Sequence, residues 1–191
     1  MIFGLDERLI FPDPAHAEED GLLAIGGDLS VERLLLAYQN GIFPWYSDDT
    51  PILWYSPHER FVLYPSELKI SKSMRQVIRS GQFTVTKNRA FDDVIKACSA
   101  ATRVDQDGTW ITDDMINAYI DLHLQGHAHS FEVWQGEQLA GGMYGVEAVK
   151  DVFCGESMFS KVSNASKMAL INLCQSADYK LIDCQVYTEH L

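Results

Sequence analysis

The spacing of apolar positions along the chain changes near residue 60. The first sixty residues hold five of the six prolines, a Gly-Gly pair at 26–27 and an Asn-Gly pair at 40–41. Such frequent turn residues permit only short elements. One helix is predicted there, over residues 31–39, because Ser30 can cap its first turn and the Asn-Gly pair can end it. We therefore expect a small, irregular N-terminal domain over residues 1–60.

From residue 61 onward, apolar residues recur at regular helix or strand spacing. Ser71 and Thr112 are suited to begin helices, and Gly81 and Gly126 are suited to end them. The pair at 135–136 predicts a hairpin turn between two later strands. The predicted strands are 61–64, 83–86, 130–134, 138–144, 152–159 and 181–186, and the predicted helices are 71–80, 91–101, 112–126 and 164–176.

This order of elements predicts the fold class. Helices come first, and an antiparallel run of strands, a helix and a last strand follow. That succession is typical of an α+β fold with helices packed on the faces of its sheet. The regular pattern extends over residues 61–191, which we expect to form the second domain.

Composition and charge exclude several classes of protein. The chain has 191 residues, 47% of them hydrophobic, and a formal net charge of −12, which argues against a protein that coats nucleic acid uniformly but leaves room for a local basic patch. The four cysteines form no C-x-x-C pair, which excludes zinc ribbons and thioredoxin-type redox motifs. The longest charge-free run, 34–47, has 14 residues, whereas a bilayer span needs about 20. The first residues, MIFGLDERL, lack a basic start, so we expect a cytoplasmic protein without membrane contact.

The cations are gathered in one window of the acidic chain. Residues 60–89 hold seven Lys and Arg residues against the single acid Glu67. Lys72, Arg75 and Arg79 are spaced so that they share one face of the helix predicted at 71–80. Such a face is typical of a solvated helix, but it also suits a polyanion lying across the surface.

Three polar side chains are candidates for chemistry. Asp183 and Gln185 are two positions apart in the last predicted strand, so their side chains should project to the same face. Glu156 lies among apolar and small residues in the strand predicted at 152–159. Both patterns are also typical of the solvent face of a half-buried strand.

Aromatic and histidine residues give two further patterns. Trp45 and Trp110 lie in aromatic stretches, and such residues pack in cores or stack on nucleobases. His123, His127 and His129 have short spacings, but Gly126 separates them and no nearby carboxylate or cysteine completes a ligand set. We therefore expect packing or surface histidines and no metal site.

Taken together, the residues resemble the leucyl/phenylalanyl-tRNA–protein transferases over nearly the whole chain. Nine ordered blocks carry the resemblance, and together they are far more specific than any single motif. The blocks are GLLAIGGDLS (21–30), LLLAYQNGIFPW (34–45), ILWYSP (52–57), GTWIT (108–112), GHAHSFEVW (126–134), GGMYGV (141–146), FCGESMFS (153–160), NASK (164–167) and LIDCQV (181–186).

The resemblance implies a fold and a reaction. It implies a small N-terminal domain joined to a GNAT-like (acetyltransferase-like) domain with a mixed, largely antiparallel sheet. Enzymes of this family move Leu, Phe and less often Met from aminoacyl-tRNA to proteins that begin with Arg or Lys. The product is marked for degradation by the N-end rule pathway. The expected partners are therefore aminoacyl-tRNA and these acceptor proteins, and we expect the protein to act as a monomer.

The resemblance also implies roles for residues of this sequence. Asp183 and Gln185 resemble the pair that orients the attacking amine, with Asp183 holding the Gln185 amide. Glu156 resembles the acidic residue near the reacting groups. The residues implied for the aminoacyl side-chain pocket are Met143, Phe153, Met158, Leu170 and Ile182. Those implied for the terminal adenosine of the tRNA are Trp45 and Trp110. Those implied for phosphate binding are Lys72, Arg75 and Arg79.

The implied chemistry needs little from the protein. An aminoacyl ester is already activated, so we expect no metal and no cofactor. The attacking α-amine has an ordinary pKa of about 7.7–8.0, so an appreciable fraction is neutral at cellular pH. Positioning and stabilisation of charge are then the main tasks of the enzyme. An apolar pocket separates similar aliphatic side chains by only about 1–3 kcal/mol, so overlap with Met is expected.

Two departures from the family keep alternatives open. The chain ends at residues 190–191, where family members continue and complete the sheet, so an unpaired sheet edge is expected. Leu173 also replaces an aromatic residue of the pocket. One alternative is an acyl-CoA-dependent GNAT acyltransferase, although the Q/R-x-x-G-x-G/A loop of that class is absent. The other is a non-catalytic protein that binds tRNA or basic N-termini.

Overall fold

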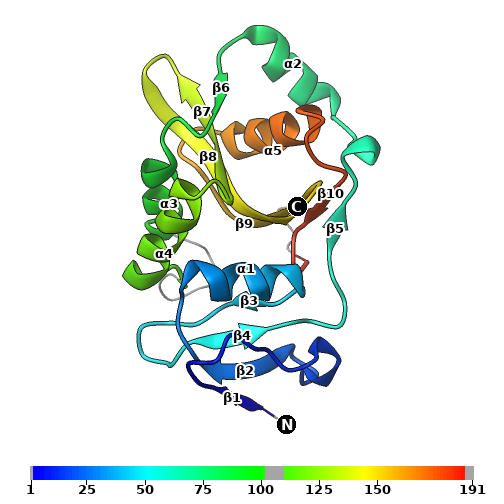
Figure 1. The fold of residues 1–191 in the computed structure, drawn as a ribbon. Helices are drawn as coiled ribbons and strands as arrows, with labels where there is room; N and C mark the ends of the chain where they lie inside the picture. Colours follow the sequence, from blue (N-terminus) through cyan, green and yellow to red (C-terminus); the bar gives the residue numbers. More distant parts are fainter. Residues whose placement is uncertain (1, 102–109, 188–191) are drawn as a thin grey trace.

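The computed structural model describes residues 2–101 and 110–187, which form two sheets and five helices within those ranges (Figure 1). The helices are α1 (Val31–Gln39), α2 (Lys72–Ser80), α3 (Phe91–Ser99), α4 (Asp113–Leu124) and α5 (Ala165–Gln175). The strands are β1 (Phe3–Leu5), β2 (Leu22–Gly26), β3 (Phe43–Pro44), β4 (Leu53–Tyr55), β5 (Val62–Leu63), β6 (Thr84–Lys87), β7 (Ala128–Gln135), β8 (Gln138–Val149), β9 (Val152–Ser160) and β10 (Leu181–Asp183). Two short 3₁₀ helices are η1 (Pro14–His16) and η2 (Pro65–Glu67).

The smaller sheet belongs to the N-terminal part of the chain. Its strand order is β1-β2-β4-β3, with β1 parallel to β2 and both remaining pairs antiparallel. The sequence predicted only one helix in this region, and α1 confirms it, with Ser30 accepting a 3.4 Å hydrogen bond from the Arg33 amide. The four strands were missed because each is two to five residues long and shows no clear alternation.

The larger sheet has the order β5-β10-β9-β8-β7-β6. Among the described residues, the β9–β10 pair is parallel and the other pairs of this sheet are antiparallel, so the sheet is mixed and largely antiparallel, as expected. The strand predicted at 181–186 is wrong in its extent, because β10 ends at Asp183. The last strand is not itself the edge of the sheet, because β5 pairs antiparallel with β10 and forms that edge within the described ranges.

Helices cover both faces of the larger sheet (Figure 1). On one face, α1, α3 and α4 pack on β7, β8 or β9, and their core includes Tyr144 and Val146. On the other face, α5 buries Ala169 and Leu173 against Phe153 and other residues of a second core. The coarse prediction of an α+β fold is therefore confirmed.

The first core does not stop at residue 60. Leu23 and Trp54 of the smaller sheet are fully buried, and they belong to the same apolar cluster as Tyr144 of the larger sheet. The two sheets are thus built from separate stretches of sequence but share one core. Burial of this apolar surface stabilises the N-terminal part against the rest of the chain.

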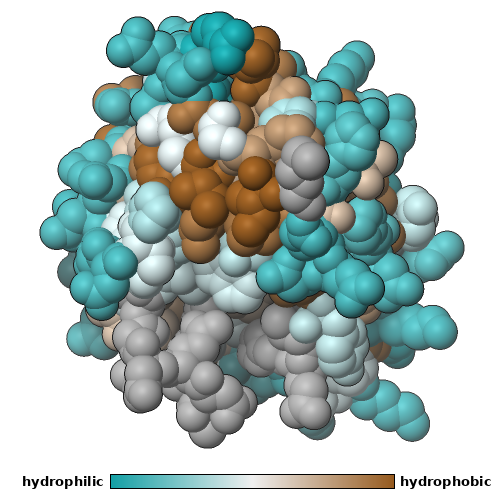
Figure 2. Space-filling view, turned by 90° about the horizontal axis from the view of Figure 1, so that it is seen from below, coloured by the Kyte–Doolittle hydropathy of each residue, from teal (hydrophilic) through white to brown (hydrophobic). Residues whose placement is uncertain are grey.

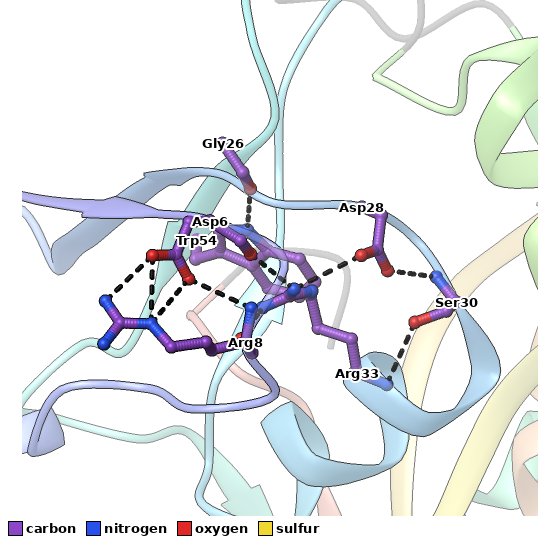
Figure 3. Close-up of polar contacts among 7 residues, drawn as sticks. All are labelled: Asp6, Arg8, Gly26, Asp28, Ser30, Arg33 and Trp54. Atoms are coloured by element: carbon purple, nitrogen blue, oxygen red, sulfur yellow. Dashed lines mark hydrogen bonds and ion pairs between the residues drawn. The ribbon is translucent and has the colours of Figure 1, made fainter.

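A buried arginine fastens the first strand to α1 (Figure 3). The Arg33 side chain is fully buried, and its guanidinium donates to the backbone oxygens of Asp6 at 2.8 Å and Arg8 at 3.2 Å and to the Asp28 carboxylate at 3.2 Å. Its Nε has no partner among the described residues. These bonds satisfy most of a guanidinium that could not otherwise be buried.

No helix in the described ranges is both long and apolar enough to cross a membrane. Viewed from the end of the molecule that carries β1, the surface shows an apolar area at its centre surrounded mainly by hydrophilic residues (Figure 2). The exposed apolar residues Ile2, Leu9 and Ile10 flank β1 in the sequence.

Candidate functional site

Glu156 is a buried carboxylate at an irregularity of the larger sheet. In the β8–β9 ladder, Tyr144 pairs with Ser157 and Gly145 pairs with Gly155, so Glu156 is the extra residue of a β-bulge. A bulge re-aims a side chain and is common next to active sites. A Cβ at Gly145 would lie 2.2 Å from the Cys154 carbonyl oxygen, so this pairing requires glycine.

The Glu156 carboxylate accepts hydrogen bonds from two other elements. The Gln185 amide nitrogen donates to Oε1 at 2.7 Å, and the Tyr119 hydroxyl of α4 donates to Oε2 at 3.3 Å. The hydroxyl of Tyr119 in turn forms a hydrogen bond with the hydroxyl of Tyr38 in α1. Glu156 is therefore tied to the C-terminal segment on one side and to two buried tyrosines on the other.

Burial shifts the proton affinities in this cluster. Loss of solvation raises the pKa of Glu156 to about 7, although the hydrogen bonds from Tyr38, Tyr119 and Gln185 favour its charged form, and the negative charge of Asp183 raises the pKa further. Burial, followed by the charge of Glu156, raises the pKa of both tyrosines well above their ordinary value. The tyrosines are therefore neutral donors, whereas Glu156 can change its charge near neutral pH.

Asp183 and Gln185 are arranged differently from the prediction. They do not project from one strand, because β10 ends at Asp183 and Gln185 has a left-handed backbone with φ 63°. Asp183 Oδ1 accepts a 2.8 Å bond from the Gln185 backbone N–H and does not hold its side-chain amide. The amide is held by Glu156 instead, and no described residue donates to Gln185 Oε1.

Two cations of the predicted basic window are already paired. Arg60 forms a salt bridge with Asp183, and Lys87 lies 3.1 Å from the Asp178 carboxylate. The window therefore offers a polyanion less charge than its composition indicates. The predicted helix of the window is confirmed, and Lys72, Arg75 and Arg79 are exposed on α2.

The predicted pocket residues come together in one apolar cluster under α5. Met143, Phe153 and Ile182 are almost fully buried, and Met158 and Leu170 are partly buried against the same core. A Cβ added at Gly155 would lie 4.0 Å from Met143 Cε and 3.8 Å from the Asp183 carbonyl oxygen. The apolar cluster is therefore adjacent to Asp183.

The two predicted tryptophans lie on adjoining segments. Trp45 is 40% exposed and its ring is 5.5 Å from that of Tyr55, whereas Trp110 is partly buried against the first core. The hydroxyl groups of Tyr46 and Thr112 are 3.2 Å apart and join these segments. The first two residues of the GTWIT block, 108–109, lie outside the described residues.

The basic helix α2 is not next to the adjoining segments that carry Trp45 and Trp110. Only Met74 is buried in α2 and Val77 is half-buried, and the helix lies at the top of the molecule whereas β3 lies in its lower half (Figure 1). A ligand that contacts both α2 and Trp45 must therefore extend along the molecule, as a nucleic acid duplex can.

The histidines have other partners. His123 forms a 2.8 Å bond with the Ala128 carbonyl oxygen and stacks on Phe91 at 4.3 Å, and His129 Nδ1 lies 2.9 Å from the Asn88 amide nitrogen. In the two described ranges, no three His, Cys, Asp or Glu residues are gathered as a metal site requires.

Sequence reasoning missed three residues of the site: Tyr38, Tyr119 and Arg60. Tyr38 lies within the recognised block 34–45, but nothing in its spacing links it to Tyr119, which is 81 residues away. Arg60 was counted only as part of the basic window. Contacts between distant segments produce these roles, and no local pattern reveals them.

Comparison with known proteins identifies the relatives of the chain. The model of the leucyl/phenylalanyl-tRNA protein transferase family matches residues 62–191, and the model of that family's N-terminal domain matches residues 27–58. Curated leucyl/phenylalanyl-tRNA–protein transferases from Anaeromyxobacter and Oleidesulfovibrio alaskensis are 55% and 56% identical over 100% of this chain and 82% and 79% of their own lengths. One from Flavobacterium johnsoniae is 54% identical over 100% of this chain and 91% of its length.

A solved structure shares part of the fold. A conserved protein of unknown function from Bacteroides thetaiotaomicron superimposes with a TM-score of 0.52 at 11% sequence identity. The match covers 66% of this chain and 49% of that chain. At this identity the likeness concerns the fold alone.

Proposed function

Because this chain belongs to the leucyl/phenylalanyl-tRNA–protein transferase family, we propose that it moves Leu, Phe and less often Met from aminoacyl-tRNA to the α-amino group of an acceptor protein. The acceptor begins with Arg or Lys, and the product is marked for degradation by the N-end rule pathway. The observation that carries the proposal is the joining of Glu156, Gln185 and Asp183 beside an apolar cluster.

Gln185 would contact the attacking amine in this reaction. Its Oε1 accepts nothing from the described residues, so it can accept a hydrogen bond from the amine. Glu156 holds the amide nitrogen and so keeps Oε1 turned toward the amine. Asp183 fixes the backbone of Gln185. Such orientation is worth more to this reaction than a strong base, because the nucleophile is already partly neutral.

The bond changes of the transfer are simple. The amine nitrogen forms a bond with the ester carbonyl carbon, and the bond between that carbon and the terminal ribose oxygen of the tRNA breaks. The proton lost by the amine passes to the departing ribose oxygen, through a neighbouring ribose hydroxyl or a water. No residue becomes covalently attached, and a group that only orients and accepts hydrogen bonds is sufficient.

The remaining predicted residues complete the proposal. Met143, Phe153, Met158, Leu170 and Ile182 would receive the Leu or Phe side chain, and Trp45 and Trp110 would hold the terminal adenosine. Lys72, Arg75 and Arg79 of α2 would contact acceptor-stem phosphates, which suits their exposure and the separation of α2 from β3 in the fold (Figure 1). The proposal includes a protein that acts as a monomer.

The proposal also covers the fold in finer detail. Residues 1–60 would form the small N-terminal domain and residues 61–191 the aminoacyl-transfer domain, with a GNAT-like arrangement of the larger sheet. The two sheets do fall on either side of residue 60 in the sequence, which is consistent with this division.

A transfer assay tests the function directly. The purified chain is mixed with tRNA charged with radioactive Phe or Leu and with a peptide that begins with Arg, and we expect labelled peptide. A peptide that differs only in beginning with Gly is the control and should stay unlabelled. Binding of charged tRNA without any transfer, or acylation of the peptide by acetyl-CoA instead, would reject the proposal.

A further inference from the structure

Arg60 lies between the N-terminal part of the chain and the end of β10. Its guanidinium forms a salt bridge with Asp183, with Nε 3.3 Å from Oδ1. The Nη1 atom donates to the Gly41 carbonyl oxygen at 3.0 Å, and the guanidinium carbon lies 5.1 Å from the centre of the Phe43 ring. Arg60 therefore joins the GIFPW segment to Asp183.

The surroundings of Arg60 require an arginine. The guanidinium contacts three groups at once: a carboxylate, a backbone carbonyl oxygen and the face of an aromatic ring. The planar guanidinium has five donors and stacks on rings, whereas a lysine ammonium is a compact point charge. The Arg60 and Asp183 side chains are only 22% and 14% exposed. Because water reaches the pair poorly, loss of the cation would leave Asp183 buried without a counter-charge.

The salt bridge between Arg60 and Asp183 also bears on the position of Gln185. The carboxylate that Arg60 holds also accepts the Gln185 backbone N–H at 2.8 Å. That bond fixes Gln185 in a left-handed backbone conformation, which is unfavourable for a residue with a side chain. The backbone of Phe61, next to Arg60, also bonds to Cys184 and Gln185 at 2.9 and 3.2 Å.

We infer that Arg60 is a positioning residue of the transfer reaction: it holds Asp183 so that Gln185 keeps the backbone conformation that aims its side chain toward the acceptor amine. The inference rests on the proposed function for the role of Gln185. It adds that the N-terminal part of the chain, through Gly41 and Phe43, helps to set the geometry of the reaction centre.

Kinetics with matched variants test the inference. In Arg60→Met we expect kcat to fall at least tenfold while the KM for charged tRNA changes less than threefold, and Arg60→Lys should recover part of the loss. Arg60→Met combined with Asp183→Asn should be no slower than Asp183→Asn alone, since both act through one contact. Arg8→Met is the control, because Arg8 pairs with Asp6 at 2.8 Å on the exposed surface, and it should keep the parental kcat.

A second measurement needs no turnover. The side-chain amide of Gln185 gives an NMR ¹H–¹⁵N signal pair that can be assigned by its loss in Gln185→Ala. We expect this pair to shift or broaden in Arg60→Met and to stay unchanged in Arg8→Met. An unchanged Gln185 signal, an unchanged kcat or additive losses in the double variant would overturn the inference. If the parent chain shows no transfer but the signal moves, the proposed function fails and the positioning contact stands.

Discussion

Two buried glutamates of the larger sheet have different surroundings. Glu132 of β7 is fully buried and in regular register, paired with Thr86 on one side and Gly142 on the other. Glu156 of β9 is 8% exposed and occupies a bulge. Residue type and burial are thus nearly the same, but the local backbone is regular in one case and irregular in the other.

The hydrogen-bond donors around the two carboxylates differ in number and kind. Glu132 accepts from the hydroxyl groups of Thr86 and Ser130, both at 2.5 Å, and from the backbone N–H groups of Arg89 and Ala90 at the start of α3. These donors surround the carboxylate, and two of them come from the backbone immediately before α3. Glu156 has fewer donors, and one of them is the Gln185 amide, whose carbonyl oxygen accepts no hydrogen bond from the residues that the structure describes.

Burial alone therefore does not identify a reactive carboxylate. A charge surrounded by fixed donors stabilises the fold, whereas a charge that holds one polar side chain in place can serve a reaction. Each of the following changes should separate the two roles or show that they overlap.

The largest effect is expected when Glu132 is changed to Gln. The substituted amide would turn its NH₂ group toward the hydrogen-bond donors that surround the carboxylate. The charge-assisted hydrogen bonds, each worth about 1.5–3 kcal/mol, would be lost. We therefore expect the free energy of unfolding to fall by about 3 kcal/mol. Urea denaturation measures the loss. At temperatures where the variant is folded, kcat should stay within threefold of the parent, and a kcat loss as large as that of a Glu156 variant would show that the two glutamates share a role.

The Glu156→Gln variant should show the opposite result. Without a carboxylate to fix the Gln185 amide, kcat for Phe transfer should fall about 100-fold, within the range for a positioned polar group. Its unfolding free energy at pH 8 should be no lower than that of the parent, because a neutral side chain avoids the burial of a charge. If urea denaturation showed Glu156→Gln to be as unstable as Glu132→Gln, the two glutamates would not differ in their roles as described.

The pH dependence should sharpen the contrast further. The charged form of Glu156 accepts from Gln185, so below its pKa of about 7 the rate of the parent should fall tenfold per pH unit in addition to the loss from the acceptor amine. The Glu156→Gln variant should show only the titration of the amine, a single-proton slope between pH 5.5 and 7. Equal slopes in parent and variant would count against a functional charge on Glu156.

The raised pKa of Glu156 should also make the free energy of unfolding depend on pH. Folding raises the Glu156 pKa from 4.5 to about 7, so in that window the unfolded chain binds fewer protons than the folded one and stability falls as the pH rises. This contribution amounts to about 3 kcal/mol between pH 4.5 and 7. It should vanish in Glu156→Gln, which urea denaturation at several pH values can measure, and its persistence there would assign the slope to other groups.

The smallest effect is expected for Tyr119→Phe. The hydroxyl of Tyr119 favours the charged form of Glu156, so its removal should raise the pKa of Glu156 and move the pH–rate profile toward higher pH by less than one unit. At pH 8.5 kcat should remain within about threefold of the parent. Tyr179→Phe removes a hydroxyl outside this cluster and serves as the control; an equal shift in both variants would show that Tyr119 does not act through Glu156.

Much of the fold could be predicted from local patterns. Ser71 and Gly81 bound α2 as predicted, because a side-chain cap and a left-handed glycine act within one turn of the helix. The hairpin between β7 and β8 followed from its turn residues. The short strands around Trp54 were missed because pairing within the fold, and not alternation, makes them strands.

The sequence named Glu156, Asp183 and Gln185 as candidates, and the structure brings them together, but through other contacts than those predicted. Alternation placed Asp183 and Gln185 on one face, but the Asp183 side chain captures the next-but-one backbone N–H and ends the strand. The bulge at Glu156 depends on the register of β8 against β9, which sequence spacing does not encode. The partner of Asp183, Arg60, is 123 residues away, so only the folded chain reveals it.

The contacts around Glu156 have a consequence for synthesis of the protein. They join side chains from positions 38, 60, 119, 156, 183 and 185, with the last two supplied by one short segment. The proposed reaction centre is therefore incomplete in a growing polypeptide until that segment has emerged from the exit tunnel of the ribosome. A messenger RNA that ends before the codon for Asp183 would therefore be expected to yield an inactive fragment rather than a weakly active enzyme.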